Sequence, residues 1–307
     1  MIEMREASGL ESATWQDGWQ RRLESWYGRY DVSAAWASKQ VEQKLAFNLG
    51  ASAASTYALT ADGTVAGLLA VGIVKQGGQP MAMISDLWVA EPHRRRGYAS
   101  AALRWALSWA QARGAASLWA ITDPAEPAHA ALFAGYTLRA QQMIKRLGSP
   151  GPLPDGLAGR PMTQDEFTAW RAESVRGYAA DISGSGTLPA AEAAVRAAAE
   201  FDQLLPAGLS TADHTFLCLD AGGEMVATNW ICHRRWPGVS WVYGVEVSEQ
   251  HRGKGYGRAA MVIGEQATLD AGDTHLALNV FGHNTVAISL YDRMGYQAIE
   301  KARSIDL

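Results

Sequence analysis

The sequence has little of several features that would each point to a particular class of protein. Its 307 residues include two cysteines, Cys218 and Cys232, too few for a disulfide framework. Both fall in strand-like runs, so we expect small buried side chains. The longest apolar runs have the length of a strand, which is too short to span a membrane. The N-terminus also lacks the basic start and apolar core of a secretory signal, and we therefore expect a cytoplasmic protein.

Concentrated positive charge is also lacking. There are 27 lysines and arginines against 31 aspartates and glutamates, a net charge of −4. Nucleic-acid binding needs clustered positive charge, so we expect no nucleic-acid partner. Histidine, cysteine and carboxylates show no metal-ligand spacing, and we expect no metal. The remaining composition, 48% apolar and 19% charged, is that of a globular protein, and the length favours two domains.

The two halves of the sequence resemble each other. Residues 93–99 (HRRRGYA) match residues 251–257 (HRGKGYG) in residue type at most positions. An apolar strand precedes each loop, and a helix-length run that ends near Gly114 or Gly272 follows it. Hairpin patterns lie upstream of both strands. Each half then closes with a Gly-Tyr pair, at 135–136 and 295–296, and a final strand. This common order indicates a tandem duplication.

A proline- and glycine-rich segment separates the halves. Residues 148–156 (GSPGPLPDG) contain three prolines and three glycines, which cannot sustain a helix or a strand. We therefore predict a first domain over residues 1–148, a linker over 149–159 and a second domain over 160–307.

The loop of the second half has the features of an anion site. It lies between a strand and the start of a helix, where unpaired N–H groups and the helix dipole favour negative charge. Its glycines let the main chain approach that anion closely. Together with Asn284, Tyr291 and the closing Gly295-Tyr296, this loop resembles the GNAT acyltransferase family. The tandem arrangement resembles the two-domain type to which mycothiol synthases belong.

The resemblance implies an α/β (α+β) fold of two tandem GNAT domains. Each would be a mixed, twisted and splayed β-sheet flanked by helices. It also implies a coenzyme A site in the second half, where Arg252 braces the loop or adds charge near the phosphates and Asn284 contacts the pantetheine arm. Two valines of the splayed strand, Val245 and Val247, would lie beside that arm. The amides that would hold the pyrophosphate belong to Gly253, Lys254, Gly255, Tyr256 and Gly257.

The resemblance further implies that Tyr291 stands beside the thioester sulfur. An amine attacks the thioester carbonyl, and the expelled thiolate, from a thiol of pKa about 8.5, gains from a proton as it leaves. A phenol of pKa about 10 stays protonated at neutral pH and can supply that proton. A backbone N–H near Val245 would stabilise the carbonyl oxygen. The general base stays open between Glu246, Tyr243 and a bound water.

The first half keeps the glycine loop but lacks the counterparts of Tyr291 and Asn284. Ala131 or Phe133 stands where the second half has Tyr291, and residues 123–127 (DPAEP) replace the asparagine region. We therefore predict a degenerate, non-catalytic first domain. Its basic cluster is either solvated or part of a second coenzyme A site, which would comprise Val89, Arg94, Arg95, Arg96, Gly97, Tyr98 and Ala99.

These expectations combine into one leading hypothesis. The protein would be an N-acyltransferase, a monomer without a membrane partner, that moves an acyl group from acetyl-CoA or another acyl-CoA to a small-molecule amine. An acyl carrier protein as donor, in natural-product biosynthesis, is the first alternative. A non-catalytic coenzyme-binding regulatory protein is the second. The absence of a basic patch disfavours transfer from aminoacyl-tRNA.

Overall fold

The computed structural model describes residues 2–50, 55–76, 79–184 and 189–307. The chain forms two compact units. Unit 1 comprises Met1–Gln142, Phe281–His283 and Ala298–Leu307, and unit 2 comprises Met143–Val280 and Asn284–Gln297. No helix in the described part of the chain has the length and apolar character needed to cross a membrane.

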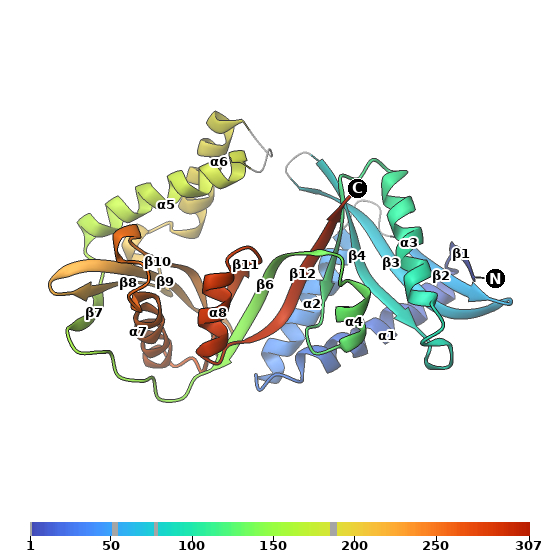
Figure 1. Ribbon diagram of the computed structural model, residues 1–307, viewed down its shortest axis with the longest axis horizontal. Helices are drawn as coiled ribbons and strands as arrows, with labels where there is room; N and C mark the ends of the chain where they lie inside the picture. Colours follow the sequence, from blue (N-terminus) through green and yellow to red (C-terminus); the bar gives the residue numbers. More distant parts are fainter. Residues whose placement is uncertain (1, 51–54, 77–78, 185–188) are drawn as a thin grey trace. The chain divides into compact units, whose positions relative to one another are not determined.

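Unit 1 is a six-stranded mixed sheet in the order β1-β2-β3-β4-β5-β12 (Figure 1). Only β4 and β5 pair in parallel; the other neighbours are antiparallel. The strands are β1 (Ile2–Glu6), β2 (Ser55–Ala61), β3 (Thr64–Gln76), β4 (Gln79–Val89), β5 (Ser117–Thr122) and β12 (Gln297–Asp306). The helices are α1 (Gly9–Tyr27), α2 (Ala34–Gly50), α3 (Tyr98–Gln111) and α4 (Pro127–Leu132), and a 3-10 turn spans Glu91–His93.

Unit 2 repeats this plan. Its strands lie in the order β7-β8-β9-β10-β11-β6. β10 and β11 pair in parallel, and the neighbours from β7 to β10 pair antiparallel. The strands are β6 (Thr137–Arg146), β7 (Leu157–Pro161), β8 (His214–Ala221), β9 (Glu224–Trp236), β10 (Val239–Val247) and β11 (His275–Phe281). The helices are α5 (Gln164–Gly184), α6 (Ala190–Leu204), α7 (Tyr256–Asp270) and α8 (Thr285–Arg293), with 3-10 turns at Gly208–Ser210 and Glu249–His251.

Helices cover both faces of the sheet in unit 2 because each carries an apolar stripe. On one face, Ala259 and Ala260 of α7 pack with Leu219 and Ala227 of the sheet. On the other face, Phe167 of α5 and Phe201 of α6 pack against further aromatic side chains of β8 and β9. In unit 1, α3 buries a stripe at helical spacing, namely Ala102, Leu103, Ala106, Trp109 and Ala110.

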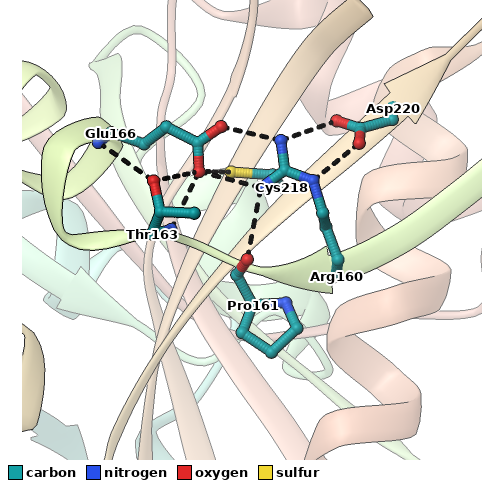
Figure 2. A network of polar contacts seen from close by, with 6 residues as sticks. All are labelled: Arg160, Pro161, Thr163, Glu166, Cys218 and Asp220. Atoms are coloured by element: carbon teal, nitrogen blue, oxygen red, sulfur yellow. Dashed lines mark hydrogen bonds and ion pairs between the residues drawn. The ribbon is translucent and has the colours of Figure 1, made fainter. Parts of the chain in front are cut away.

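One arginine ties the edge strand of unit 2 to the start of α5 (Figure 2). Arg160 of β7 donates through Nη1 and Nη2 to the Glu166 carboxylate, and through Nε to Asp220 of β8 at 2.6 Å. Glu166 also accepts from the N–H of Thr163, and Thr163 Oγ1 accepts from the N–H of Glu166, which makes a capping box. These bonds hold the pKa of Glu166 low, at about 2, chiefly through Arg160. The network therefore fixes where α5 begins.

The last strands of the two halves differ from the sequence-based expectation that each half keeps its own. β12, from the end of the chain, pairs with β5 in unit 1, from Lys301↔Thr122 to Asp306↔Ser117. Figure 1 shows this red strand beside the strands of unit 1. Conversely, β6 of the first half lies next to β11, and its last residues, from Met143, belong to unit 2. The N–H of Leu147, directly after β6, donates to the carbonyl of Thr274.

Candidate active site

The parallel strand pair of unit 2 separates partway along its length. β10 and β11 pair from Val239↔His275 to Val242↔Leu278, whereas β10 continues to Val247. The register with β9 shifts between Val242 and Gly244, so Tyr243 is the extra residue of a β-bulge. Beyond the bulge, among the described residues, the edge of β10 that faces β11 has no strand partner. Its main-chain groups are therefore available to an extended ligand.

The loop after β10 presents backbone amides at the start of α7. Gly253 and Gly255 have φ values of +78° and +85°, a region that other residues adopt at a cost. Gly255 is the N-cap of α7 and makes no side-chain capping bond, so the first helical N–H groups are open to an anion. Lys254 lies between the two glycines and is exposed.

Arg252 braces this loop. Its Nε donates to the carbonyl of Val247 at 3.3 Å, and the matching Arg94 in unit 1 donates to the carbonyl of Val89 at 3.1 Å. The neighbouring His251 packs edge-on against the ring of Tyr256, with 6.1 Å between ring centroids. Of the two roles that the sequence left open for Arg252, bracing is the one for which the structure has a contact.

Helix α8 of unit 2 carries two of the predicted site residues, Asn284 at its N-cap and Tyr291. Asn284 is its N-cap, and the Asn284 Oδ1 accepts from the N–H of Ala287 at 3.1 Å. This bond leaves the Nδ2 group of Asn284 for a ligand carbonyl. Leu290 lies near the loop: a Cβ added to Gly257 would stand 3.4 Å from its Cδ2. Tyr291 follows Leu290 directly.

The phenol of Tyr291 is partly buried. Its ring contacts that of Tyr296 at 5.8 Å between centroids, and burial raises the pKa of Tyr291. In the described part of the chain, no hydrogen bond engages its hydroxyl. A phenol of raised pKa stays protonated well above neutral pH, so Tyr291 can serve as a proton donor but not as a base.

Glu246 is exposed, and its neighbours fix which way it points. Val245 and Val247 pack against the cluster formed with Ala259 and Ala260 of α7. Because successive strand residues face opposite sides, Glu246 projects from the face that α5 and α6 cover. Val245 and Val247 lie on the α7 side, and only their backbone groups can reach the open edge of β10.

The same face of β10 carries a stack of three rings, of which the sequence named Tyr243 as a candidate base but did not connect His214 with the site. Tyr243 stacks on Trp230 at 4.5 Å between centroids and on His214 at 5.9 Å. The Trp230 Nε1 donates to Nδ1 of His214 at 2.8 Å, so the neutral imidazole carries its proton on Nε2. Burial lowers the pKa of His214 and raises that of Tyr243. His214 begins β8 without any local motif, so only the fold brings it here.

The loop of unit 1 has the same geometry with one difference. Arg95, at φ +61°, takes the place of Gly253, while Gly97 at φ +82° is the N-cap of α3. This loop borders a cleft of about 930 Å³ that α1, β4 and α4 also line. Of the residues predicted for a second coenzyme site, Val89, Arg94, Arg95, Gly97, Tyr98 and Ala99 line the cleft, whereas Arg96 does not. Phe133 of unit 1 is buried.

In the described residues, no group of three or more histidine, cysteine or carboxylate side chains could hold a metal ion. The two cysteines are unpaired and buried, and burial raises the pKa of the Cys218 thiol to about 11.

Comparisons with known proteins identify the family of the chain. The model of the acetyltransferase (GNAT) family matches residues 15–136 and 187–296, the greater part of the chain. An uncharacterized N-acetyltransferase of Bacillus subtilis, YdgE, is 31% identical over 140 residues, which cover 44% of this chain and 88% of that protein. A mycothiol acetyltransferase of Paenarthrobacter aurescens is 28% identical over 247 residues, 76% of this chain and 72% of its own.

Solved structures share the tandem fold. A tandem GNAT protein from the clavulanic acid biosynthesis pathway covers 100% of this chain and 98% of its own, with a TM-score of 0.50 and 17% identity. A GCN5-related N-acetyltransferase from Sphaerobacter thermophilus covers 99% and 95%, with a TM-score of 0.55 and 17% identity. The predicted fold class is confirmed, and the chain belongs to the GNAT family of acetyltransferases, as a tandem member with two GNAT domains.

Proposed function

We propose that unit 2 transfers an acyl group from an acyl-CoA thioester, acetyl-CoA in the first instance, to the amine of a small molecule. The observation that carries the proposal is the phenol of Tyr291, whose hydroxyl has no partner in the described chain and whose pKa is raised by burial. It follows Leu290, which reaches the anion-binding loop at Gly257. The proposed proton donor and the anion-binding loop therefore lie in neighbouring parts of unit 2.

The donor would be held mainly by main-chain groups. The diphosphate rests on the amides from Gly253 to Gly257, and Lys254 adds a positive charge at the exposed rim. The pantetheine arm extends along the open edge of β10 past residues 243–247, as an added strand would. The Nδ2 group of Asn284 donates to a carbonyl of that arm.

The transfer step then needs two proton transfers, one to the leaving sulfur and one from the attacking nitrogen. The amine nitrogen attacks the thioester carbonyl carbon, and the oxygen takes the electron pair, stabilised by a backbone N–H near Val245. The carbonyl re-forms as the C–S bond breaks, and Tyr291 gives its proton to the departing thiolate. Glu246, on the face that α5 and α6 cover, accepts the proton that the amine nitrogen loses. Tyr243 is unsuited to that role because its raised pKa keeps it a neutral phenol.

The test is thiol release from acetyl-CoA, longer acyl-CoA and an acyl carrier protein, each with a panel of amines. For Tyr291→Phe we expect kcat to fall about 100-fold or more, with coenzyme binding unchanged, since removal of a general acid has this size of effect. Tyr30→Phe removes a hydroxyl that donates to the carbonyl of Ala298 in unit 1, and serves as the matched control.

Three outcomes of this experiment would contradict the proposal or favour one of its alternatives. Release that persists at the wild-type rate in Tyr291→Phe removes the proposed acid. Release from the carrier protein but not from coenzyme A changes the donor. Tight coenzyme binding without release from any donor favours the regulatory alternative.

A further inference from the structure

The cleft of unit 1 has the size and position of a ligand site. Its volume of about 930 Å³ lies within the roughly 300–1,000 Å³ typical of small-molecule pockets. One end is formed by the loop at the start of α3, where Gly97 makes no side-chain capping bond. Helix α1, which the sequence did not connect with any ligand, also lines the cleft.

Beside this cleft, β4 separates from its parallel neighbour β5, as β10 separates from β11 in unit 2. The parallel pairing of β4 with β5 ends at Ile84↔Ala120, and β4 continues to Val89. The register with β3 shifts so that Ser85 is bulged. The residue after the bulge is Asp86, at the position that Gly244 occupies in unit 2. Unit 1 therefore has a carboxylate at the splayed edge where unit 2 has no side chain.

One carboxylate oxygen of Asp86 accepts hydrogen bonds, whereas the other has none in the described residues. Its Oδ2 accepts from Nε1 of Trp15 at 2.8 Å and from Nη2 of Arg22. In the described chain no bond reaches Oδ1, and Asp86 lines the cleft. Burial raises the pKa of Asp86, against the opposing effect of Arg22. A carboxylate that lines a cleft, with one oxygen held by two donors and the other without a hydrogen bond in the described chain, is suited to accept a proton from a ligand.

The other walls indicate what kind of ligand fits. Trp19 and Trp26 of α1 and Trp88 of β4 supply indole surface. Arg22 and Arg29 also line the cleft, paired with Asp86 and Asp123 respectively. Because Asp86 and Asp123 each already have a guanidinium partner, neither is left to balance the charge of an aliphatic ammonium, which is therefore a poor fit. An arylamine is neutral at pH 7, and its flat ring suits the indoles.

We propose that unit 1 is a second acyl-transfer centre, which takes an arylamine and in which Asp86 accepts the proton of the attacking nitrogen. This proposal rests on the proposed function in one respect, namely that the acyl donor is a thioester. The nitrogen attacks the thioester carbon, the N–H proton passes to Asp86 Oδ1, and the C–S bond breaks as the carbonyl re-forms. The thiolate takes its proton from water, because Phe133 has no hydroxyl. Asp86 then returns its proton to solvent.

The experiment isolates unit 1 with Tyr291→Phe. In that background, acetyl-CoA is incubated with aniline or, as the aliphatic match, with cyclohexylamine, and thiol release is followed. We expect release with aniline, and a loss of about tenfold or more when Asp86→Asn is added. Asp17→Asn, which changes an exposed aspartate of α1, is the control and leaves the rate unchanged.

A second variant guards against a folding defect in Asp86→Asn. Ala99→Trp fills the loop end of the cleft without touching Asp86 and must lower the same rate. Undiminished release in either variant, or no aniline-dependent release in Tyr291→Phe, overturns the proposal and leaves unit 1 as the non-catalytic domain that the sequence predicted. Failure of the proposed function looks different: Tyr291→Phe then has no effect with any amine, while Asp86→Asn still lowers release with aniline.

Discussion

At the residue scale, close packing decides which small side chains unit 2 can tolerate. Gly264 of α7 lies against Asn229, a buried residue whose Nδ2 donates to the carbonyl of Ala260 at 2.8 Å. A Cβ at Gly264 would stand 2.4 Å from that Nδ2. We predict that Gly264→Ala lowers the free energy of unfolding by about 1–3 kcal/mol, the usual cost of overpacking.

The matched control for Gly264→Ala is another helical glycine with room around it. Gly177 of α5 is exposed and has no atom within 4 Å of an added Cβ. Gly177→Ala is expected to raise the free energy of unfolding by about 0.4–1 kcal/mol, since alanine loses less backbone freedom. Urea denaturation of both variants measures the difference, and equal effects of the same sign would contradict the packing argument.

A buried histidine makes the stability of unit 2 depend on pH. His233 lies between Ser240, at 3.0 Å from Nδ1, and Thr215, at 2.8 Å from Nε2. Burial lowers the pKa of His233, so the unfolded chain binds a proton near pH 6.5 that the folded chain does not yet bind. The stabilising effect is therefore complete above pH 6.5 and is lost as pH falls from there through the lower folded pKa.

The measurement is the free energy of unfolding at pH 7.5 and pH 5.5. We expect the wild type to lose stability between these values, and His233→Gln to lose less because it removes one of the groups responsible. His129 and His214, whose pKa values burial also lowers, act in the same direction in both proteins. An identical loss in variant and wild type would show that His233 does not contribute.

At the element scale, a triad of the same three residue types, centred on a buried glutamate, holds each exchanged strand. In unit 1, Glu300 of β12 accepts from Tyr27 of α1 at 2.5 Å and pairs with Lys44 of α2 at 2.7 Å. In unit 2, Lys145 of β6 pairs with Glu265 of α7 at 2.7 Å, and Tyr296 donates to the same carboxylate at 3.1 Å. Both glutamates are almost fully buried.

We predict that Glu300→Ala destabilises unit 1 by about 3–5 kcal/mol, because it leaves the Lys44 charge without its buried partner. Glu42→Ala, which breaks the exposed pair with Lys39 on the same helix α2, should cost less than about 1 kcal/mol. Thermal unfolding of both variants compares them. Similar small losses would mean that Lys44 is solvated in the folded chain and that the triad does not anchor β12.

The sequence predicted the local elements better than their partners. The strand, glycine loop and helix around Gly255 were recognisable because glycine positions and apolar periodicity are local signals. The role of α1 in the cleft was not recognisable, since its apolar residues look like an ordinary core-facing stripe and Arg22 like a surface arginine until β4 packs against them. Asp86 was missed for the same reason: a lone aspartate in a strand gains meaning only from the bulge at Ser85 and the bonds from Trp15 and Arg22.

At the scale of the whole molecule, the exchange of final strands was beyond the sequence. Residues 137–146 and 297–306 follow equivalent Gly-Tyr pairs and have similar strand patterns. Either could in principle close either sheet, and local pattern does not specify which non-local partner a strand takes. The structure places Ala298–Leu307 in unit 1, although the rest of unit 1 ends at Gln142 apart from a short segment at 281–283.

This exchange predicts how the halves behave when separated. Residues 1–148 lack β12, which supplies six pairs to β5 and the Glu300 carboxylate to Tyr27 and Lys44. Residues 149–307 lack β6 and with it Lys145, the partner of Glu265. We expect each fragment alone to be poorly folded, because a sheet edge and a buried charge are left without partners.

Co-expressed, the fragments should associate and regain thiol release that depends on Tyr291. Circular dichroism and thermal unfolding of the separate and combined fragments test this, with the unsplit chain as reference. A fragment 1–148 that unfolds cooperatively at the temperature of unit 1 in the intact chain would show that β6 can take the place of β12, and the exchange would then not be needed for folding.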